Sequence, residues 1–289
     1  MLGCVVLNYN DYPTTSLLLD RIRDFKCFNK IVVVDGASTD DSYTQLTKYS
    51  SDKVMVIKAD RNGGYGYGNN IGIRTCKDLG LKYVLIANPD VVFTEQTVVN
   101  MLEIIDKEEK CVAISPRMKG REPAMRILSP WIDVWASFIF VNAVIKPRNY
   151  KSGYYSNNQV SEVDVLPGSL VMFDVARVIE CGLYDERVFL YHEEYIMAVK
   201  FRKKGYRSLL DMNDEYIHNH SVTVSKVFKN PVVSKRIALK SHRIYLEEYL
   251  DAPFIVIMIF YCLYPFVCLE SWMWGLIKWM NCQWKRKKH

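Results

Sequence analysis

The sequence predicts an α/β fold built on a doubly wound, mostly parallel sheet. Short apolar runs alternate with amphipathic segments of helical length over the first 116 residues. The runs are continuously apolar, which indicates strands buried on both faces, and their alternation with helices indicates parallel strands joined by crossovers. The predicted strands cover 4–8, 31–35, 54–58, 83–88 and 111–115, and the predicted helices cover 14–25, 40–49, 67–78 and 95–107.

The pattern changes beyond residue 116. Residues 117–162 are aromatic-rich and are interpreted as a loop-like insertion. Regularity returns with a strand at 163–173 and a helix from Glu193 to Lys204 that Gly205 ends. The predicted organisation is a domain at 1–225 with halves 1–116 and 117–225, a basic connecting helix at 226–251, and a hydrophobic, aromatic tail at 252–289.

The charge distribution and the cysteine content indicate which partners and which cellular compartment to expect. The net charge is +6, and basic residues gather at 226–243 and 285–288, which predicts an anionic neighbour such as the inner leaflet of a membrane. We expect no nucleic acid, because the sequence contains no zinc-finger, homeodomain or RNP-like motif. Eight cysteines without a CxxC pair indicate free thiols, and the N-terminus runs directly into a strand pattern, so we expect a cytoplasmic protein.

Polar residues stand where the apolar runs stop. Ligands of doubly wound sheets bind outside the carboxyl ends of the strands, so these residues are expected to share one site. They are Asn8 and Asn10 after the first run, Asp35 after the second, Gly64, Asn69 and Asn70 after the third, and Asn88 and Asp90 after the fourth.

The glycine-rich stretch "NGGYGYGNNIG" has two interpretations. Its spacing matches neither a dinucleotide fingerprint nor a P-loop. The glycines can serve a turn and a tightly packed helix, or they can let the backbone approach a nucleotide or sugar closely, with Asn69 and Asn70 as donors.

Seven segments together resemble the bacterial family 2 glycosyltransferases, in particular the rhamnosyltransferase-like group that builds O-antigens, capsules and related glycans. The resemblance covers about residues 3 to 225 and implies a GT-A fold, a divalent metal (Mg²⁺ or Mn²⁺), a nucleotide-diphospho-sugar donor and inversion at the anomeric carbon. The segments are "VVLNYN", "IVVVDGASTDDS", "NGGYGYGNNIG", "NPDVVF", "LPGSLVMF", "GLYDERVFLYHEEY" and "FRKKGY".

The segment Asn88-Pro89-Asp90 resembles the family's D-x-D metal motif. A hard cation neutralises the departing diphosphate, and Pro89 keeps Asn88 extended, so that Asp90 can reach the metal from the end of the strand. The alternative is an Asx-Pro turn that only ends a strand. The segment "IHNHSVTVS" resembles a His-x-x-Ser segment and points to His218, or to His220, as a metal or diphosphate contact; the alternative is a structural histidine.

The resemblance also assigns residues to the binding of the nucleotide. It implies that Asp35 accepts a hydrogen bond from the imide N–H of uracil or thymine, with Asn8 and Asn10 near the base and ribose. Asp35 has a second interpretation as an acid in the loop before a helix.

The acidic pair of "YHEEY" resembles the catalytic acids of the family, with Glu194 as general base and Glu193 beside it. Helical spacing places Glu194 on one stripe with Met197 and Phe201, where burial would raise its pKa. The alternative is a pair of acids that favourably occupy a helix N-terminus.

The acceptor side shows both a match and departures from the family. Gly168 and Ser169 of "LPGS" are assigned to the acceptor. Ile196-Met197 and Lys200 stand where the family has Asp-Leu and Arg, and Asn88 stands where the D-x-D motif has its first Asp. These departures raise a second hypothesis, a catalytically lapsed protein that binds a nucleotide or partners a membrane complex.

The tail contains an uncharged 18-residue run from Ala252 to Leu269, interrupted by Pro265 and followed by four tryptophans. We expect interfacial or re-entrant helices; a true membrane span and an interface in a homo-oligomer are the alternatives. The sequence thus predicts a peripheral glycosyltransferase at the cytoplasmic face of the bacterial inner membrane. It would transfer rhamnose from dTDP-rhamnose to a polyprenyl-diphosphate-linked glycan, with a UDP-hexose donor or a soluble nucleotidyltransferase as alternatives.

Overall fold

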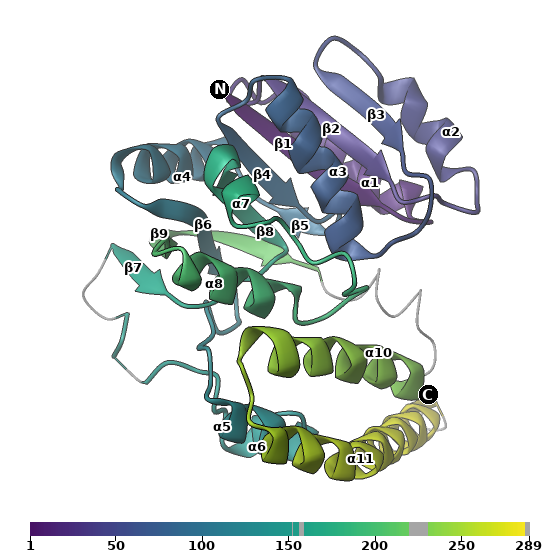
Figure 1. The fold of residues 1–289 in the computed structure, drawn as a ribbon. Helices are drawn as coiled ribbons and strands as arrows, with labels where there is room; N and C mark the ends of the chain where they lie inside the picture. The colour runs from purple at the N-terminus through teal and green to yellow at the C-terminus, as the bar shows by residue number, and fades with distance from the viewer. Residues whose placement is uncertain (152, 156–158, 220–230, 287–289) are drawn as a thin grey trace.

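One mixed sheet of nine strands organises the chain, which the computed structural model describes over residues 1–151, 153–155, 159–219 and 231–286 (Figure 1). The strand order is β3-β2-β1-β4-β8-β6-β9-β5, and β7 pairs with β9. The strands are β1 Leu2–Asn8, β2 Lys30–Asp35, β3 Val54–Lys58, β4 Tyr83–Ala87, β5 Val91–Val92, β6 Cys111–Met118, β7 Val160–Val163, β8 Leu170–Asp174 and β9 Arg207–His218.

The N-terminal half of the sheet is parallel, as predicted: β1 pairs in parallel with β2 and β4, and β2 with β3. The second half is mixed, because β8 inserts antiparallel between β4 and β6, while β6 and β9 are parallel. The strand predicted at 163–173 is shorter than expected. It begins at Leu170, and the residues before it, including Gly168 and Ser169, form an irregular connection.

Helices cover both faces of the parallel half, which explains the continuously apolar strands. Cys4 and Val6 of β1 join the core on one face, while Val5 between them joins the core on the other. The helices of this domain are α1 Tyr12–Ile22, α2 Ser42–Leu46, α3 Tyr65–Asp78, α4 Glu95–Lys107, α7 Val175–Glu180 and α8 Glu193–Lys203.

Two glycines of the glycine-rich stretch serve the packing of α3 on β1. A Cβ at Gly68 would stand 2.3 Å from a methyl of Leu7, and one at Gly72 would stand 2.3 Å from a methyl of Val5. Both distances are far below van der Waals contact, so a side chain there would push the helix off the sheet. The packing interpretation therefore holds for these two positions.

The segment predicted as a loop-like insertion contains regular structure. It forms α5 Pro130–Trp135, α6 Ile139–Val144 and β7. The basic connecting segment forms α10 Pro231–Ile244 and a π-helical turn, Tyr245–Tyr249; His220, Lys226 and Lys229 lie outside the described residues. Below the sheet, α10 and α5 pack with the C-terminal helix α11, and α8 contacts the π-helical turn (Figure 1).

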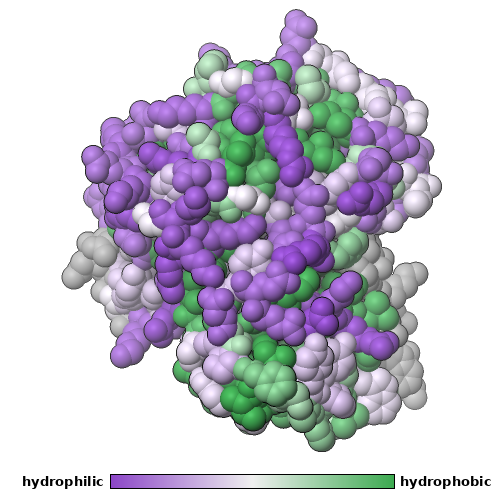
Figure 2. All heavy atoms as spheres, in the orientation of Figure 1, coloured by the Kyte–Doolittle hydropathy of each residue, from purple (hydrophilic) through white to green (hydrophobic). Residues whose placement is uncertain are grey.

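The tail forms one helix, α11 Phe254–Arg286, which continues through Pro265. Its segment Phe254–Ile277, of 24 residues and mean hydropathy 2.0, is long and apolar enough by length and composition to cross a membrane. Figure 2 shows hydrophobic side chains gathered at this end of the molecule, below a largely hydrophilic face. The exposed large apolar side chains here include Trp131, Trp135, Phe140 and Ile145 of the insertion and Phe254, Met258, Phe266, Leu269, Trp272 and Trp274 of α11.

Candidate active site

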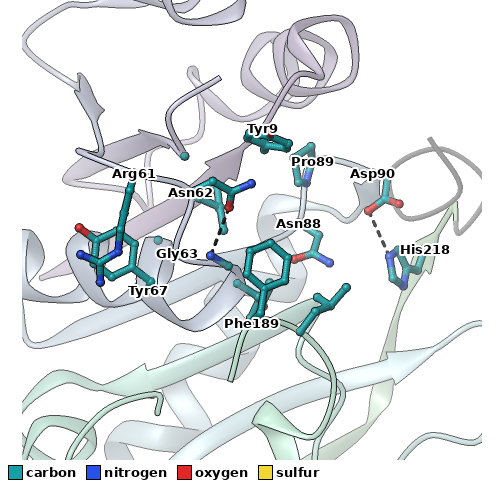
Figure 3. A pocket seen from close by; sticks show the side chains of 16 residues that line it. Tyr9, Arg61, Asn62, Gly63, Tyr67, Asn88, Pro89, Asp90, Phe189 and His218 are labelled. Atoms are coloured by element: carbon teal, nitrogen blue, oxygen red, sulfur yellow. Dashed lines mark hydrogen bonds and ion pairs between the residues drawn. The ribbon is translucent and has the colours of Figure 1, made fainter. Parts of the chain in front are cut away.

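A pocket of about 190 Å³ opens where β1, β2 and β4 end, at the edge that the sequence predicts (Figure 3). Its walls come from the loops after these strands and from two segments of the second half of the chain. The lining residues are Leu7, Tyr9, Gly36, Arg61, Asn62, Gly63, Gly64, Tyr65, Tyr67, Gly68, Asn88, Pro89, Asp90, Phe189, Leu190 and His218. Of the predicted donor and metal residues, Gly64, Asn88, Asp90 and His218 therefore meet in one place.

Asp90 and His218 face each other at one end of the pocket (Figure 3). The Oδ1 atom of Asp90 lies 3.1 Å from Nε2 of His218, and both side chains are almost buried. Antiparallel pairing of β5 with β9 sets this distance, because Val91 is in register with His218. A carboxylate oxygen beside an imidazole nitrogen, at the wall of an open pocket, is a donor set that suits a divalent transition metal such as Mn²⁺, whereas Mg²⁺ prefers oxygen ligands alone.

Gly64 joins the glycine-rich loop to the segment that precedes the acidic pair. Its φ of 88° lies in the left-handed region, and a Cβ there would stand 2.1 Å from the carbonyl oxygen of Phe189. The N–H of Tyr65 donates to that same oxygen at 2.9 Å. Only glycine permits this close approach, so the close-approach interpretation holds here, with a backbone segment as the neighbour.

Sequence reasoning missed several pocket residues. Arg61 lies over the ring of Tyr67, with its guanidinium carbon 4.5 Å from the ring centroid, at the end of the pocket opposite Asp90 (Figure 3). Tyr9 and Phe189 add aromatic surface. The position of Arg61 directly before the glycine run was the available signal, whereas Phe189 reaches the pocket only through tertiary packing.

Asn8 and Asp35 are fully buried and bond to each other instead of lining the pocket. The Asp35 carboxylate accepts from Nδ2 of Asn8 at 2.9 Å and from the N–H and O–H of Ser38 at 2.9 and 2.7 Å. Asn10 bonds Ser38 and Thr39. These residues therefore shape the loop after β2, and Gly36 is the part of that loop that reaches the pocket.

Asn69 and Asn70 do not reach the pocket either. The Asn70 amide donates to the carbonyl of Tyr184 and to Glu186, and its oxygen accepts from the N–H of Tyr184 at 3.0 Å. Asn69 is fully buried and donates to the carbonyl of Tyr65. In this structure Asn70 clamps α3 to the segment after α7, in place of the expected donor contact.

The acidic pair begins α8 in a buried environment. Glu194 shares a small cavity with Met197 and Phe201, which confirms the predicted stripe. Burial raises the pKa of Glu194 and of Glu193, and Oε2 of Glu193 has no hydrogen-bond partner among the described residues. Raised carboxyl pKa values suit a proton acceptor that works near neutral pH.

The "LPGS" segment connects this acidic pair to the pocket. A Cβ at Gly168 would stand 3.0 Å from Oε1 of Glu194, and the Gly168 carbonyl accepts from the hydroxyl of Tyr65 at 2.5 Å. The polar groups of Ser169 are hydrogen-bonded within the protein. Its hydroxyl bonds that of Tyr216 at 2.7 Å, and its carbonyl accepts from the N–H of Asn88. Tyr65 and Gly168 therefore separate Glu194 from the pocket.

The departures from the family pattern have structural roles. Ile196 is fully buried in the core beneath α8. Lys200 donates to the carbonyls of Gly182 and Leu183 at 3.2 and 2.7 Å, which ties α8 to the end of α7.

The fold defines the class of the protein: it has the GT-A architecture of glycosyltransferases. Two solved structures share it, GalNAc-T7 with UDP, GalNAc and Mn²⁺ (TM-score 0.59, 15% identity, 75% of this chain) and the mannosyltransferase PcManGT from Pyrobaculum calidifontis with GDP-Man and Mn²⁺ (TM-score 0.57, 16% identity). The second match covers 93% of this chain and 72% of PcManGT, whereas the chain spans 43% of the GalNAc-T7 chain.

The chain belongs to glycosyl transferase family 2, whose model matches residues 4–161, and it is a glycosyltransferase. It is also similar to the low-salt glycan biosynthesis hexosyltransferase Agl10 of Haloferax volcanii, with 28% identity over 226 residues. That match covers 76% of this chain and 68% of Agl10.

Replacing Asp90 by Asn tests the metal site. Asp90→Asn keeps the shape of the side chain but removes a charged ligand, so we expect an unchanged melting temperature without ligand. Transfer should fall by about 100-fold or more, and metal-dependent nucleotide binding by calorimetry should weaken in parallel. Asp20→Asn, at an exposed position on α1, is the matched control. Normal transfer by Asp90→Asn would exclude this site.

Replacing Glu194 by Gln tests the general base. Glu194→Gln should lower transfer by about 10²–10⁴-fold and leave metal-dependent donor binding intact, while Glu193→Gln is milder. In the wild type, transfer should fall as the pH drops through the raised pKa of Glu194, because protonation removes the base.

Stability gives an independent readout of the same pair. Folding raises the pKa of both carboxyl groups, so their ionisation destabilises the folded protein as the pH rises through the raised pKa. Gln cannot ionise, so both Gln variants should melt at or above the wild-type temperature at pH 7. Full transfer by Glu194→Gln together with an inactive Glu193→Gln would identify Glu193 as the general base. Normal transfer by both variants would exclude both residues from that role.

Proposed function

We propose that this chain transfers a hexose, with inversion, from a nucleoside diphosphate sugar to a polyprenyl-diphosphate-linked glycan at the cytoplasmic face of the cell membrane. The donor that we propose is dTDP-rhamnose. The observation that carries the proposal is the Asp90–His218 pair, 3.1 Å apart at the wall of a pocket bounded by the glycine-rich loop. The named relatives support the reaction class, since one is a hexosyltransferase and one a mannosyltransferase bound to GDP-Man and Mn²⁺.

Different residues around the pocket are proposed to bind the cation, the phosphates and the base or sugar. Asp90 and His218 would hold the divalent cation, which would supply positive charge against the departing diphosphate. Arg61, held over Tyr67, offers a guanidinium to the phosphate oxygens from the other end of the pocket. The rings of Tyr9 and Phe189 provide apolar walls for the base or the sugar.

Glu194 accepts the proton of the attacking hydroxyl. It is separated from the donor pocket by Tyr65 and Gly168, so these two residues must move slightly, or the acceptor must enter between them, for the base to reach the hydroxyl.

The exposed apolar side chains at the lower end of the molecule support the membrane location. Free in water, so large an apolar surface would be unusual for a monomer. It is carried by α5, α6 and α11, and α10 contributes the cations Lys240 and Arg243 beside it. An anionic bilayer surface complements both features.

A second candidate is a catalytically lapsed protein that binds a nucleotide sugar without transferring it. Ile196 favours this candidate, because a buried apolar residue occupies the position at which the family carries an acid. Release of nucleoside diphosphate on incubation with donor and metal separates the two candidates.

The donor assignment predicts the outcome of a nucleotide-sugar screen with Mn²⁺. At about 100 times its dissociation constant, dTDP-rhamnose should stabilise the fold by about 2.7 kcal/mol, seen as a rise in melting temperature. UDP-glucose and GDP-mannose should give smaller shifts. Stabilisation by either of these without a response to dTDP-rhamnose would refute rhamnose but keep the enzyme class.

The membrane assignment predicts the effect of charges on the exposed face of α11. The triple variant Phe266→Glu, Leu269→Glu and Met273→Glu changes side chains that are more than half exposed, so the fold should persist by circular dichroism. Co-sedimentation with phosphatidylglycerol vesicles should be lost. Leu17→Glu, equally exposed on α1, is the control that keeps binding. Sedimentation of the triple variant at the wild-type level would place the contact elsewhere.

A further inference from the structure

A second polar cavity, of about 120 Å³, lies between the start of α8 and the helical layer below it. It is separate from the donor pocket and from the cavity of Glu194. Its polar lining consists of Ser137, Asn142, Arg148, His192, Lys235 and His242. Among the described residues that line it there is no carboxylate, so no side chain that faces the cavity carries a negative charge.

Among the described lining residues, His192 is the one with two buried, unpaired polar atoms. Neither of its ring nitrogens contacts solvent or has a hydrogen-bond partner among the described residues. The ring stacks on that of His242 at a centroid distance of 4.6 Å, and burial lowers the pKa of His192. Buried polar atoms without partners are costly and uncommon, so two on one ring that lines a cavity indicate a missing ligand.

Two cations, Arg148 and Lys235, line the cavity. Arg148 donates to Asp133 at 2.7 Å, while its Nε has no partner among the described residues. Lys235 donates to the carbonyl of Ser137 at 2.6 Å, and burial lowers its pKa. Asp133 lies behind the cavity wall, and its Oδ2 atom is hydrogen-bonded to Nε2 of His242 at 2.5 Å. Asp133 offsets one of the two cations, so the residues that line the cavity together with Asp133 carry a positive excess.

A metal ion fits this cluster less well. Ligand atoms of Asp133, His192 and His242 lie within 4.8 Å of one another. However, both oxygens of Asp133 already hold hydrogen bonds, one from a guanidinium, and Lys235 stands at the same cavity. Two fixed cations would repel a third, whereas they would attract an anion.

We propose that this cavity binds a phosphate or diphosphate group, bonded by Arg148, Lys235 and His192. Resting on the proposed function, the group is the diphosphate that links the acceptor glycan to its lipid. The cavity adjoins the helices that carry the exposed apolar side chains. Residues 189–194 connect it to the reaction: Phe189 lines the donor pocket, His192 lines this cavity, and Glu194 follows two residues later.

Calorimetry with inorganic diphosphate on the full chain, in chelator so that the donor pocket holds no metal, tests the anion site. His192→Phe keeps the stacked ring, and Lys235→Gln removes one charge; each should weaken diphosphate binding about tenfold or more. Lys240→Gln, exposed on the same helix, should bind like the wild type. Because its nitrogens lack partners, His192→Phe should also melt at or above the wild-type temperature. Unchanged binding in both cavity variants, or binding of Zn²⁺ in place of diphosphate, would overturn the site.

Vesicles distinguish the source of the phosphate. Anionic vesicles that contain polyprenyl diphosphate should recruit the wild type more than the same vesicles without it, and Lys235→Gln should lose only this gain. Recruitment that ignores polyprenyl diphosphate, with free diphosphate still bound, would overturn the lipid assignment. Metal-dependent donor binding, measured on the same variants, reports separately on the proposed glycosyl transfer and should not change.

Discussion

Antiparallel pairing of two residues of β5 with the end of β9 is the contact on which the site depends. Val91 and Val92 hold Ile217 and His218 in register, and this joins the N-terminal half of the sheet to the second half. Asp90 and His218 are brought to 3.1 Å only because β9 is itself fixed along β6 and β7. A two-residue strand has little stability of its own, so the proposed metal site relies on the rest of the sheet.

The parallel half of the fold was predictable, because its buried strands are continuous apolar runs. The short helices α5 and α6 were not, since helices of six residues are stable only through tertiary packing, here against α11. Asp90 and His218, which the resemblance assigns to the metal, line one pocket. The resemblance also assigned donor contacts to Asn8 and Asn70, because a sequence does not reveal that a polar side chain is already bonded inside the protein.

The segment between α7 and α8 concentrates the unfavourable features of the structure. Tyr191 and His192 both have positive φ values, of 68° and 65°, and Glu193 and Glu194 are buried acids. Strained backbone and buried ionisable groups persist where function requires them, at a cost that the surrounding core must offset. This segment borders the donor pocket, the phosphate cavity and the proposed base, which gives a single physical reason for the strain.

The central claim is that Asp90 and His218 together hold the divalent cation at the donor diphosphate. Anomalous diffraction from crystals grown with Mn²⁺ and a nucleoside diphosphate measures this directly. We expect one manganese peak at bonding distance from Asp90 Oδ1 and His218 Nε2, in contact with the diphosphate. A peak among Asp133, His192 and His242, or a bound nucleotide with no manganese beside Asp90, would contradict it.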